Sequence, residues 1–235
     1  MITERYERGL VKTPLGFPPR PVPGSTIDLR HNEIATPKIN GSRTLWNLQT
    51  GEVFNRKMRP FAQNGGIDFD VKHEILKELR HQINSDTVEW VDIEYVPLTL
   101  KCANGRRLGS DPQAFIIDVL PDPGNHANAD YHERIEFYKN VPIVNDRSSL
   151  VDVSREVLSN GLQDNNVWRF PIYTEEDDAE RAFLLHKKNW EMLDARDIGN
   201  QYLWEGIVAV DITLPYRLTP KQTMNMDMHT KYRFR

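Results

Sequence analysis

Hydrophobic residues recur with a helical period between residues 68 and 84. They are three or four positions apart, so a helix over this stretch would carry them on one side. Asp68 or Asp70 suits the N-terminal cap of such a helix, because a carboxylate accepts hydrogen bonds from the first free N–H groups. The pattern therefore predicts an amphipathic helix. Its apolar residues are Val71, Ile75, Leu76, Leu79 and Ile83.

Three other stretches have patterns typical of helices. They cover residues 131–140, 150–159 and 175–196, and the last is the longest and most regular. No internal repeat or low-complexity tract is found between them. The sequence thus predicts four helices separated by other elements.

Strand patterns lie between these helices and predict hairpins. Residues 34–39 lead into a glycine turn, and residues 44–46 continue as a second strand. Gln49-Thr50-Gly51-Glu52 has the composition of a hairpin turn into a third strand at 53–54. Hairpins with interspersed helices predict an α+β fold in which helices flank antiparallel sheets. The remaining strand candidates are residues 89–100, 114–120, 206–214 and 231–235.

Prolines are concentrated near the start of the chain. Residues 11–26 contain five prolines and two glycines, which exclude a helix and favour an extended segment. We therefore divide the sequence into an extended proline-rich arm at 1–30 and one domain at 31–235. A length of 235 residues is enough to bury a substantial core.

Composition narrows the class of protein. Hydrophobic residues make up 39% and charged residues 27%, as in soluble globular domains. No apolar run is long enough to cross a membrane, and the first residues lack a signal-peptide core, so no membrane association is expected. The single cysteine, Cys102, excludes an intramolecular disulfide and a cysteine-based zinc site. It favours a reducing, cytoplasmic compartment.

The net charge of -4 hides an uneven distribution. Residues 1–60 carry ten Lys/Arg and five Asp/Glu, and the rest of the chain is acidic on balance. The last nineteen residues are basic again. Positive charge at both ends is compatible with docking of a polyanion and equally with an ordinary mixed surface.

Candidate chemistry is concentrated in six short segments. The first, Lys38-Ile39-Asn40-Gly41-Ser42-Arg43, combines a glycine that lets a nucleotide approach the backbone with an amine that can attack phosphorus once deprotonated. Taken singly, each segment has an ordinary alternative, such as a solvated lysine, a polar strand face or a core phenylalanine. The other five, in chain order, are Phe54-Asn55-Arg56, Asp92-Ile93-Glu94, Phe115-Ile116-Ile117-Asp118-Val119-Leu120, Glu205-Gly206-Ile207-Val208 and Lys231-Tyr232-Arg233.

The order and spacing of the six segments resemble the covalent nucleotidyltransferase superfamily, which comprises ATP-dependent DNA and RNA ligases and mRNA capping enzymes. The resemblance runs from about residue 36 to the end of the sequence. It implies the fold of a ligase adenylation domain. Asn55, Ile93 and Arg233 stand where the family usually has serine, glycine and lysine.

The resemblance implies a covalent role for Lys38, which would form a phosphoramide with the AMP part of ATP. It implies that Arg43 reaches the nucleotide sugar. Arg56 would help to hold a 5′-phosphate end, a task suited to a guanidinium group. Glu94 is expected to contact the ribose and Phe115 to stack on the purine base.

The last two segments are expected to handle phosphate and metal. Glu205 would hold the catalytic Mg²⁺ or Mn²⁺, because a carboxylate oxygen is a hard ligand. Lys231 would contact the α-phosphate and take part in the first chemical step with Lys38. Arg233 keeps the positive charge of the family's second lysine, although a guanidinium differs from an ammonium in shape.

The implied reaction seals a strand break in DNA or RNA. Lysyl-AMP forms, AMP passes to a 5′-phosphate end, and a 3′-hydroxyl then displaces it. Family members usually carry an oligonucleotide-binding barrel after the last segment, so we expect either a minimal ligase or an accessory protein that supplies the missing surface. A capping-type guanylyltransferase and a non-catalytic nucleic-acid-binding subunit are the alternatives.

Overall fold

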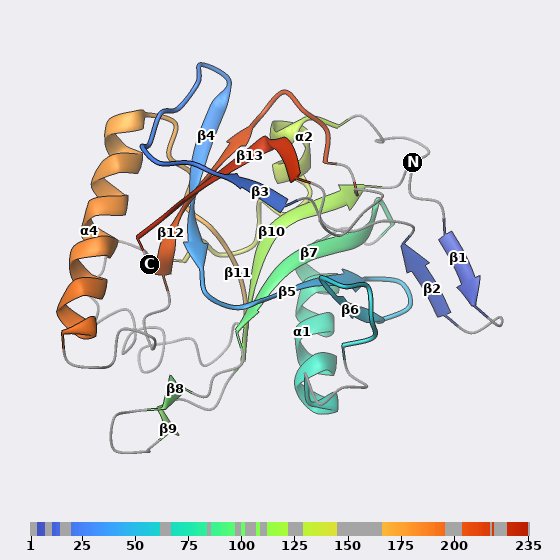
Figure 1. Cartoon of the computed structure of the whole chain (residues 1–235). Coiled ribbons are helices and arrows are strands. Elements are labelled where there is room, and N and C mark those ends of the chain that lie inside the picture. The colour runs from blue at the N-terminus through green and yellow to red at the C-terminus, as the bar shows by residue number, and fades with distance from the viewer. Residues whose placement is uncertain are drawn as a thin grey trace.

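The fold consists of two stacked β-sheets with helices on their outer faces (Figure 1). The computed structural model describes residues 4–7, 11–14, 20–61, 67–83, 86–96, 100–101, 107–108, 112–121, 129–144, 166–195, 204–216, 218 and 225–234. Two small antiparallel ribbons accompany the sheets. They are formed by β1 (Glu4–Glu7) with β2 (Val11–Pro14), and by β8 (Leu100–Lys101) with β9 (Arg107–Leu108).

The larger sheet has five strands in the order β11-β10-β7-β5-β6. Neighbouring strands are antiparallel, except that β11 joins β10 in parallel. Buried side chains such as Trp46, Val91 and Ile116 project from one side of the sheet into the main core. The strands are β5 (Ser42–Asn47), β6 (Val53–Asn55), β7 (Val88–Val96), β10 (Gln113–Pro121) and β11 (Val167–Arg169).

The smaller sheet has four strands in the order β3-β13-β12-β4. β12 pairs antiparallel with both β4 and β13, and β3 joins β13 in parallel. β3 comes from the proline-rich stretch, and an edge strand tolerates prolines because one of its sides needs no hydrogen-bond donors. The strands are β3 (Arg20–Pro23), β4 (Glu33–Ile39), β12 (Trp204–Asp211) and β13 (Asn225–Arg233).

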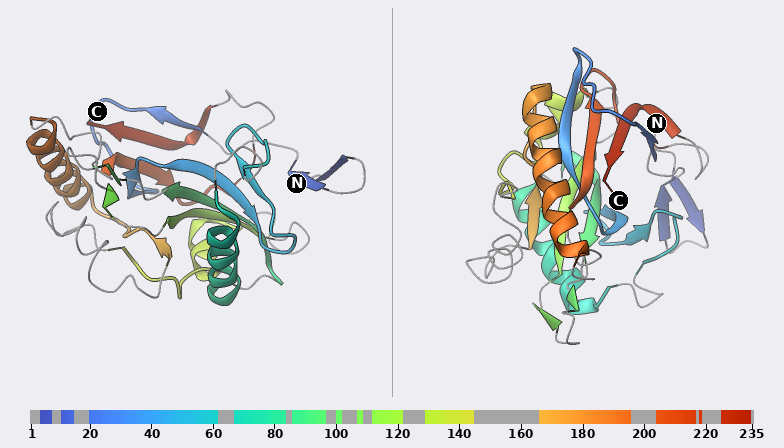
Figure 2. Two further views of the ribbon diagram at one scale, coloured as in Figure 1. Left: turned by 90° about the horizontal axis from the view of Figure 1, so that it is seen from below. Right: turned by 60° about the vertical axis from the view of Figure 1, so that its left-hand side comes forward.

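Each sheet has its own helix on the outside (Figure 2). Helix α1 (Phe69–Gln82) packs Ile75 and Leu79 against the five-stranded sheet. Its N-cap is Asp68, which accepts a hydrogen bond from the backbone N–H of Asp70. Helix α4 (Glu176–Asp194) covers β4 and β12, and the short helix α2 (Tyr131–Glu136) lies against β10.

The predicted α+β class with antiparallel sheets is confirmed. The helices predicted at 68–84 and 175–196 correspond to α1 and α4, whereas the helix predicted at 131–140 already ends at Glu136. The strand predicted at 231–235 is the end of the longer β13. The helix predicted at 150–159 lies outside the described residues. In the described part of the chain, no helix is long and apolar enough to cross a membrane.

Candidate active site

The first segment joins the two sheets. β4 ends and β5 begins within it, so Lys38 belongs to the four-stranded sheet and Arg43 to the five-stranded sheet. Between them, Gly41 donates its backbone N–H to Oε1 of Glu94 at 3.0 Å. A Cβ atom on Gly41 would lie 2.8 Å from the carbonyl oxygen of Tyr95, so the close approach requires glycine.

Lys38 contacts Glu205, which lies 167 positions later in the chain. Nζ of Lys38 donates a hydrogen bond to Oε1 of Glu205. Nη2 of Arg233 donates to the same oxygen at 3.1 Å, so two cations share one carboxylate oxygen. The side chains of Lys38 and Glu205 are 16% and 12% exposed, and that of Arg233 is 46% exposed. The ion pair is therefore largely screened from water and is most open on the Arg233 side.

An extra residue in β12 directs Glu205 toward Lys38. The register of β12 against β4 shifts between Trp204 and Gly206, which makes Glu205 the additional residue of a β-bulge. A bulge turns a side chain out of the normal alternation of a strand. Gly206 has a φ of 151°, and a Cβ atom there would lie 1.8 Å from the carbonyl oxygen of Tyr232. Glycine is thus required at the position that makes the bulge.

The basic residues of β13 lie on the same side of the sheet as Lys38. Gly206 pairs with Lys38 on one side and with Arg233 on the other, and paired residues project to the same face. Lys231 comes two positions before Arg233 and so shares that face. It pairs with Val208, however, one step further along β12 from Glu205. Arg233 therefore has the direct contact with Glu205, and Lys231 lies beside it.

On the five-stranded sheet, Arg43 is held by Asp92. Nε of Arg43 lies 3.0 Å from both carboxylate oxygens of Asp92, and Nη2 donates to Asp92 and, at 3.3 Å, to Oη of Tyr216. Burial opposes the positive charge of Arg43, but Asp92 and Tyr216 more than offset it and raise the pKa of the guanidinium. The two acidic residues of β7 thus have different partners: Asp92 binds Arg43, and Glu94 binds the glycine turn.

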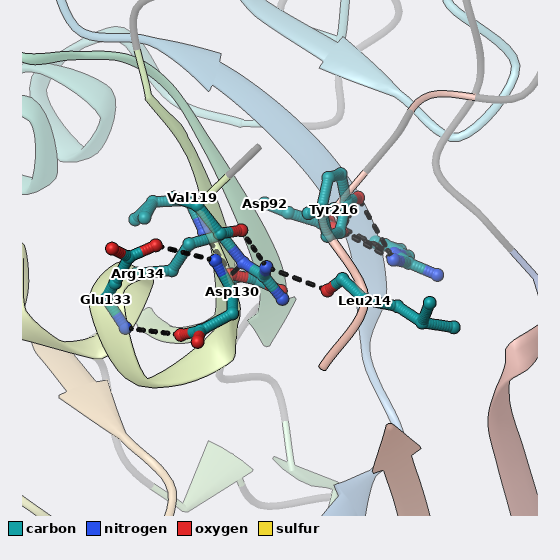
Figure 3. Close-up of polar contacts among 10 residues, drawn as sticks. Asp92, Val119, Asp130, Glu133, Arg134, Leu214 and Tyr216 are labelled. Atoms are coloured by element: carbon teal, nitrogen blue, oxygen red, sulfur yellow. Dashed lines mark hydrogen bonds and ion pairs between the residues drawn. The ribbon is translucent and has the colours of Figure 1, made fainter. Parts of the chain in front are cut away.

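A second buried carboxylate lies opposite Asp92. Asp118 on β10 pairs with Asp92 in the sheet, and both are almost inaccessible to solvent. Burial, and to a lesser degree Asp92, raises the pKa of Asp118, while Arg134 of α2 lowers it. Nε and Nη2 of Arg134 donate to the two oxygens of Asp118 at 2.8 and 3.0 Å. Figure 3 shows Arg134 and its hydrogen bonds, with Asp92 and Tyr216 nearby.

Phe115 is buried in the core, whereas Arg56 is exposed to solvent. Phe115 is 1% exposed and stacks on Phe170, with ring centroids 5.8 Å apart. It pairs with Glu94 across the sheet, yet an adenine ring would reach it only if this packing opened. Phe115 is therefore a buried residue covered by Phe170, and its base-stacking role stays a prediction. Arg56 is exposed in the turn after β6, at the edge of the five-stranded sheet.

The carboxyl group of Glu94 has a pKa near neutrality. Burial raises the pKa of Glu94 to about 7, Lys38 and Arg43 lower it in part, and Asp92 adds to the rise. The half-buried carboxyl group therefore exchanges its proton near neutral pH. An additional bound cation would favour its ionised form.

The acidic groups near Lys38 are compatible with Mg²⁺ only if a substrate supplies further ligands. Among the described residues, no group of three or more histidine, cysteine, aspartate or glutamate side chains could hold a metal ion. Mg²⁺ commonly uses one or two protein carboxylates together with water and substrate phosphates. Glu205 offers one such carboxylate, and its contacts with Lys38 and Arg233 both involve Oε1.

Tyr216 and His229 were not predicted from the sequence to belong to this region. Tyr216 follows β12 in a stretch without a recognisable motif, so nothing in the sequence pointed to it. His229 is buried on the same face of β13 as Lys231. Burial, with Arg43 and Arg134, lowers the pKa of His229 to about 3, so this histidine adds no positive charge at neutral pH.

Comparison with known proteins finds structural likeness at low sequence identity. No protein-family model matches the chain, and no curated protein matches it. The ligase domain of M. tuberculosis LigD has a TM-score of 0.49 and 14% identity over 93% of this chain and 59% of its own. A mycobacterial DNA ligase D complexed with ATP and MES gives 0.49 and 14%, over 92% of this chain and 59% of that one.

A Lig E DNA ligase has a TM-score of 0.46 and 10% identity, over 91% of this chain and 68% of its own. The chain thus spans about three-fifths of the length of the first two structures.

Replacing Gly206 with alanine should destabilise the fold and displace Glu205. The new methyl group would collide with the Tyr232 carbonyl, and alanine disfavours the φ of 151°. We expect a loss of about 2 kcal/mol or more in the free energy of unfolding, measured in urea. The control Val208→Ala, at a partly buried position of the same strand, should cost less. Equal losses in the two variants would show that the bulge does not need glycine.

Replacing Glu94 with glutamine should stabilise the protein at alkaline pH. The pKa of Glu94 in the fold, about 7, exceeds its ordinary value of 4.5, so its proton stabilises the fold below pH 4.5 and this contribution is lost as pH rises through 7. Glutamine keeps an acceptor for Gly41 without the buried charge. At pH 8 the variant should be more stable by about 1–3 kcal/mol.

The advantage of Glu94→Gln should shrink by at least half when urea unfolding is repeated at pH 5. Glu136→Gln, on the exposed side of α2, removes one carboxylate elsewhere and serves as the control. A stability difference that is the same at both pH values would contradict the assignment.

Proposed function

We propose that this protein is an ATP-dependent polynucleotide ligase in which Lys38 becomes bonded to AMP. The observation that carries the proposal is the contact between Lys38 and Glu205, two residues from widely separated segments of the sequence pattern. Arg233 binds the same carboxylate, and Glu94 binds the turn that follows Lys38. A nucleophile, an acidic group and phosphate-binding cations are thereby present at one place, as nucleotidyl transfer requires.

The contacts suggest how the first step would proceed. The Lys38 ammonium gives up a proton, and the Glu205 carboxylate is close enough to receive it. The free amine then attacks the α-phosphorus of ATP, a P–N bond forms, and the P–O bond to pyrophosphate breaks. Arg233 and Lys231 offset the charge that develops on the phosphate oxygens. Arg43 and Glu94 contact the sugar.

A divalent ion would be held by Glu205 together with phosphate oxygens. Mg²⁺ or Mn²⁺ bound there supplies charge stabilisation to the phosphoryl groups. Because Lys38 and Arg233 occupy one oxygen of this carboxylate, the ion and the lysine interact with the same group. Binding of the ion would weaken the hold of Glu205 on Lys38.

The nucleic acid would be a strand with a 5′-phosphate end and a strand with a 3′-hydroxyl end, in DNA or RNA. Arg56, Lys57 and Arg59 form an exposed basic turn at the edge of the five-stranded sheet. Exposed guanidinium and ammonium groups bind phosphates in a manner that weakens as salt is added. Assays on nicked DNA, nicked RNA and single-stranded RNA distinguish the substrates.

Lys38→Arg should abolish covalent labelling by ATP. Arginine keeps a cation next to Glu205 but provides no nucleophile, so the fold survives and the chemistry does not. The measurement is incubation with α-labelled ATP and Mg²⁺, followed by denaturing electrophoresis. Lys57→Arg, in the exposed turn, should keep wild-type labelling. Label retained by Lys38→Arg would disprove the role of Lys38. Labelling of the wild type by GTP instead of ATP would indicate a capping-type enzyme. Absence of label with either nucleotide would indicate a binding protein.

Glu205→Gln should slow the labelling reaction on the order of 100-fold, because a neutral amide neither holds the metal nor accepts the lysine proton. The rate measured against Mg²⁺ concentration should also reach its plateau at higher metal concentrations. Glu136→Gln is again the control for loss of one carboxylate. A wild-type rate with an unchanged metal dependence would argue strongly against this role.

A further inference from the structure

A buried tyrosine from outside the six segments connects to the predicted sugar-binding arginine. Tyr216 follows β12, and its ring packs among apolar side chains of the five-stranded sheet, including Leu45 and Trp90. Its hydroxyl group donates to Oδ2 of Asp92. Nη2 of Arg43 donates to the same hydroxyl at 3.3 Å. Tyr216 therefore contacts both members of the Arg43–Asp92 pair.

Tyr216 is a fixed hydrogen-bond donor in this group. Burial, followed by the adjacent Asp92, raises the pKa of Tyr216 well above its ordinary value, so the hydroxyl stays protonated. Asp92 is fully buried and accepts from Nε of Arg43 with both of its oxygens. A planar guanidinium bound on one edge by a carboxylate and at Nη2 by a hydroxyl has little rotational freedom.

The segment that carries Tyr216 is itself anchored. Nη1 of Arg134 donates to the backbone carbonyl of Leu214 at 3.1 Å, and Arg134 is in turn bound to Asp118 (Figure 3). Asp118 lies opposite Asp92 across the strands. The position of the Tyr216 hydroxyl is thus tied to the same sheet that carries Arg43.

We propose that Asp92 and Tyr216 are positioning residues that aim Arg43 at the hydroxyl groups of the nucleotide sugar. The inference rests on the proposed function, which places ATP next to Lys38 and its sugar next to Arg43. A site built to hydrogen-bond a hydroxyl discriminates strongly against an analogue that lacks it, provided that its donor is held in place. Loosening the donor should therefore reduce the preference for ATP over deoxy-ATP more than it reduces the rate of chemistry.

The test is Tyr216→Phe, which removes one hydroxyl group and keeps the ring. Single-turnover self-labelling is followed over a range of concentrations of ATP, 2′-deoxy-ATP and 3′-deoxy-ATP, with kcat the maximal rate constant and KM the half-saturating concentration. Loss of one hydrogen bond should raise the KM for ATP about 3- to 10-fold with little change in kcat. One of the two deoxy-nucleotides lacks the hydroxyl group that Arg43 binds in ATP. The preference for ATP over that nucleotide, expressed as the ratio of their kcat/KM values, should fall by a similar factor.

Tyr138→Phe is the matched control. Tyr138 is as deeply buried as Tyr216, but its hydroxyl interacts with Tyr131 rather than with Arg43. Its removal should leave the ratio unchanged even if stability drops. The positioning role would be overturned if Tyr216→Phe left the ratio of kcat/KM values unchanged, that is, if ATP and both deoxy-nucleotides were affected equally. Labelling of the wild-type protein would still uphold the proposed function. Absence of label on the wild-type protein would overturn both.

Discussion

Two carboxylates face each other across neighbouring strands in the interior, and the protein depends on the arginines that neutralise them. Asp92 and Asp118 are paired positions of β7 and β10, where like charges repel and burial penalises each of them. Arg43 binds one and Arg134 the other. A buried charge left without its partner costs about 3–5 kcal/mol. This tetrad ties α2 and the start of β5 to the centre of the larger sheet.

The tetrad also makes Arg43 a residue with two tasks. It completes the segment that begins at Lys38, and it compensates the charge of Asp92. Because folding requires the guanidinium to stay with Asp92, the end of the segment is held before any ligand arrives. The neighbouring turn is fixed in the same way, by the bond from Gly41 to Glu94. The site is therefore largely preorganised by contacts that also stabilise the sheet.

The sequence predicted the local elements well because they follow from periodicity and turn chemistry. The helix over 68–84, its aspartate cap and the hairpin at Gly51 all depend on neighbouring residues. It also indicated that Lys38 and Glu205 belong together, through the order of the segments. The β-bulge that turns Glu205 toward Lys38 could not be predicted, because it arises from the pairing of two strands that are far apart in the chain.

Packing partners were the least predictable feature. The segment around Phe115 has an aromatic residue at the expected place, but Phe170 covers it, and that contact depends on β11 joining β10 in parallel. Tyr216 belongs to no pattern, since a single tyrosine between other residues reveals nothing about the aspartate that it will bind. Such pairings are set when the sheets assemble, and no short stretch of sequence specifies them.

The parallel edge strand β3 affects whether two copies of the protein can pair through their sheet edges. β13 carries Lys231 and Arg233, and β3 occupies the outer row of its backbone hydrogen-bonding groups. Without β3 that row would be free to bind a strand of a second molecule, as exposed sheet edges do. Pro21 and Pro23 lack the N–H groups that would extend the sheet further. The proline-rich stretch thus supplies an edge strand that ends the sheet and prevents β13 from pairing with a strand of a second molecule.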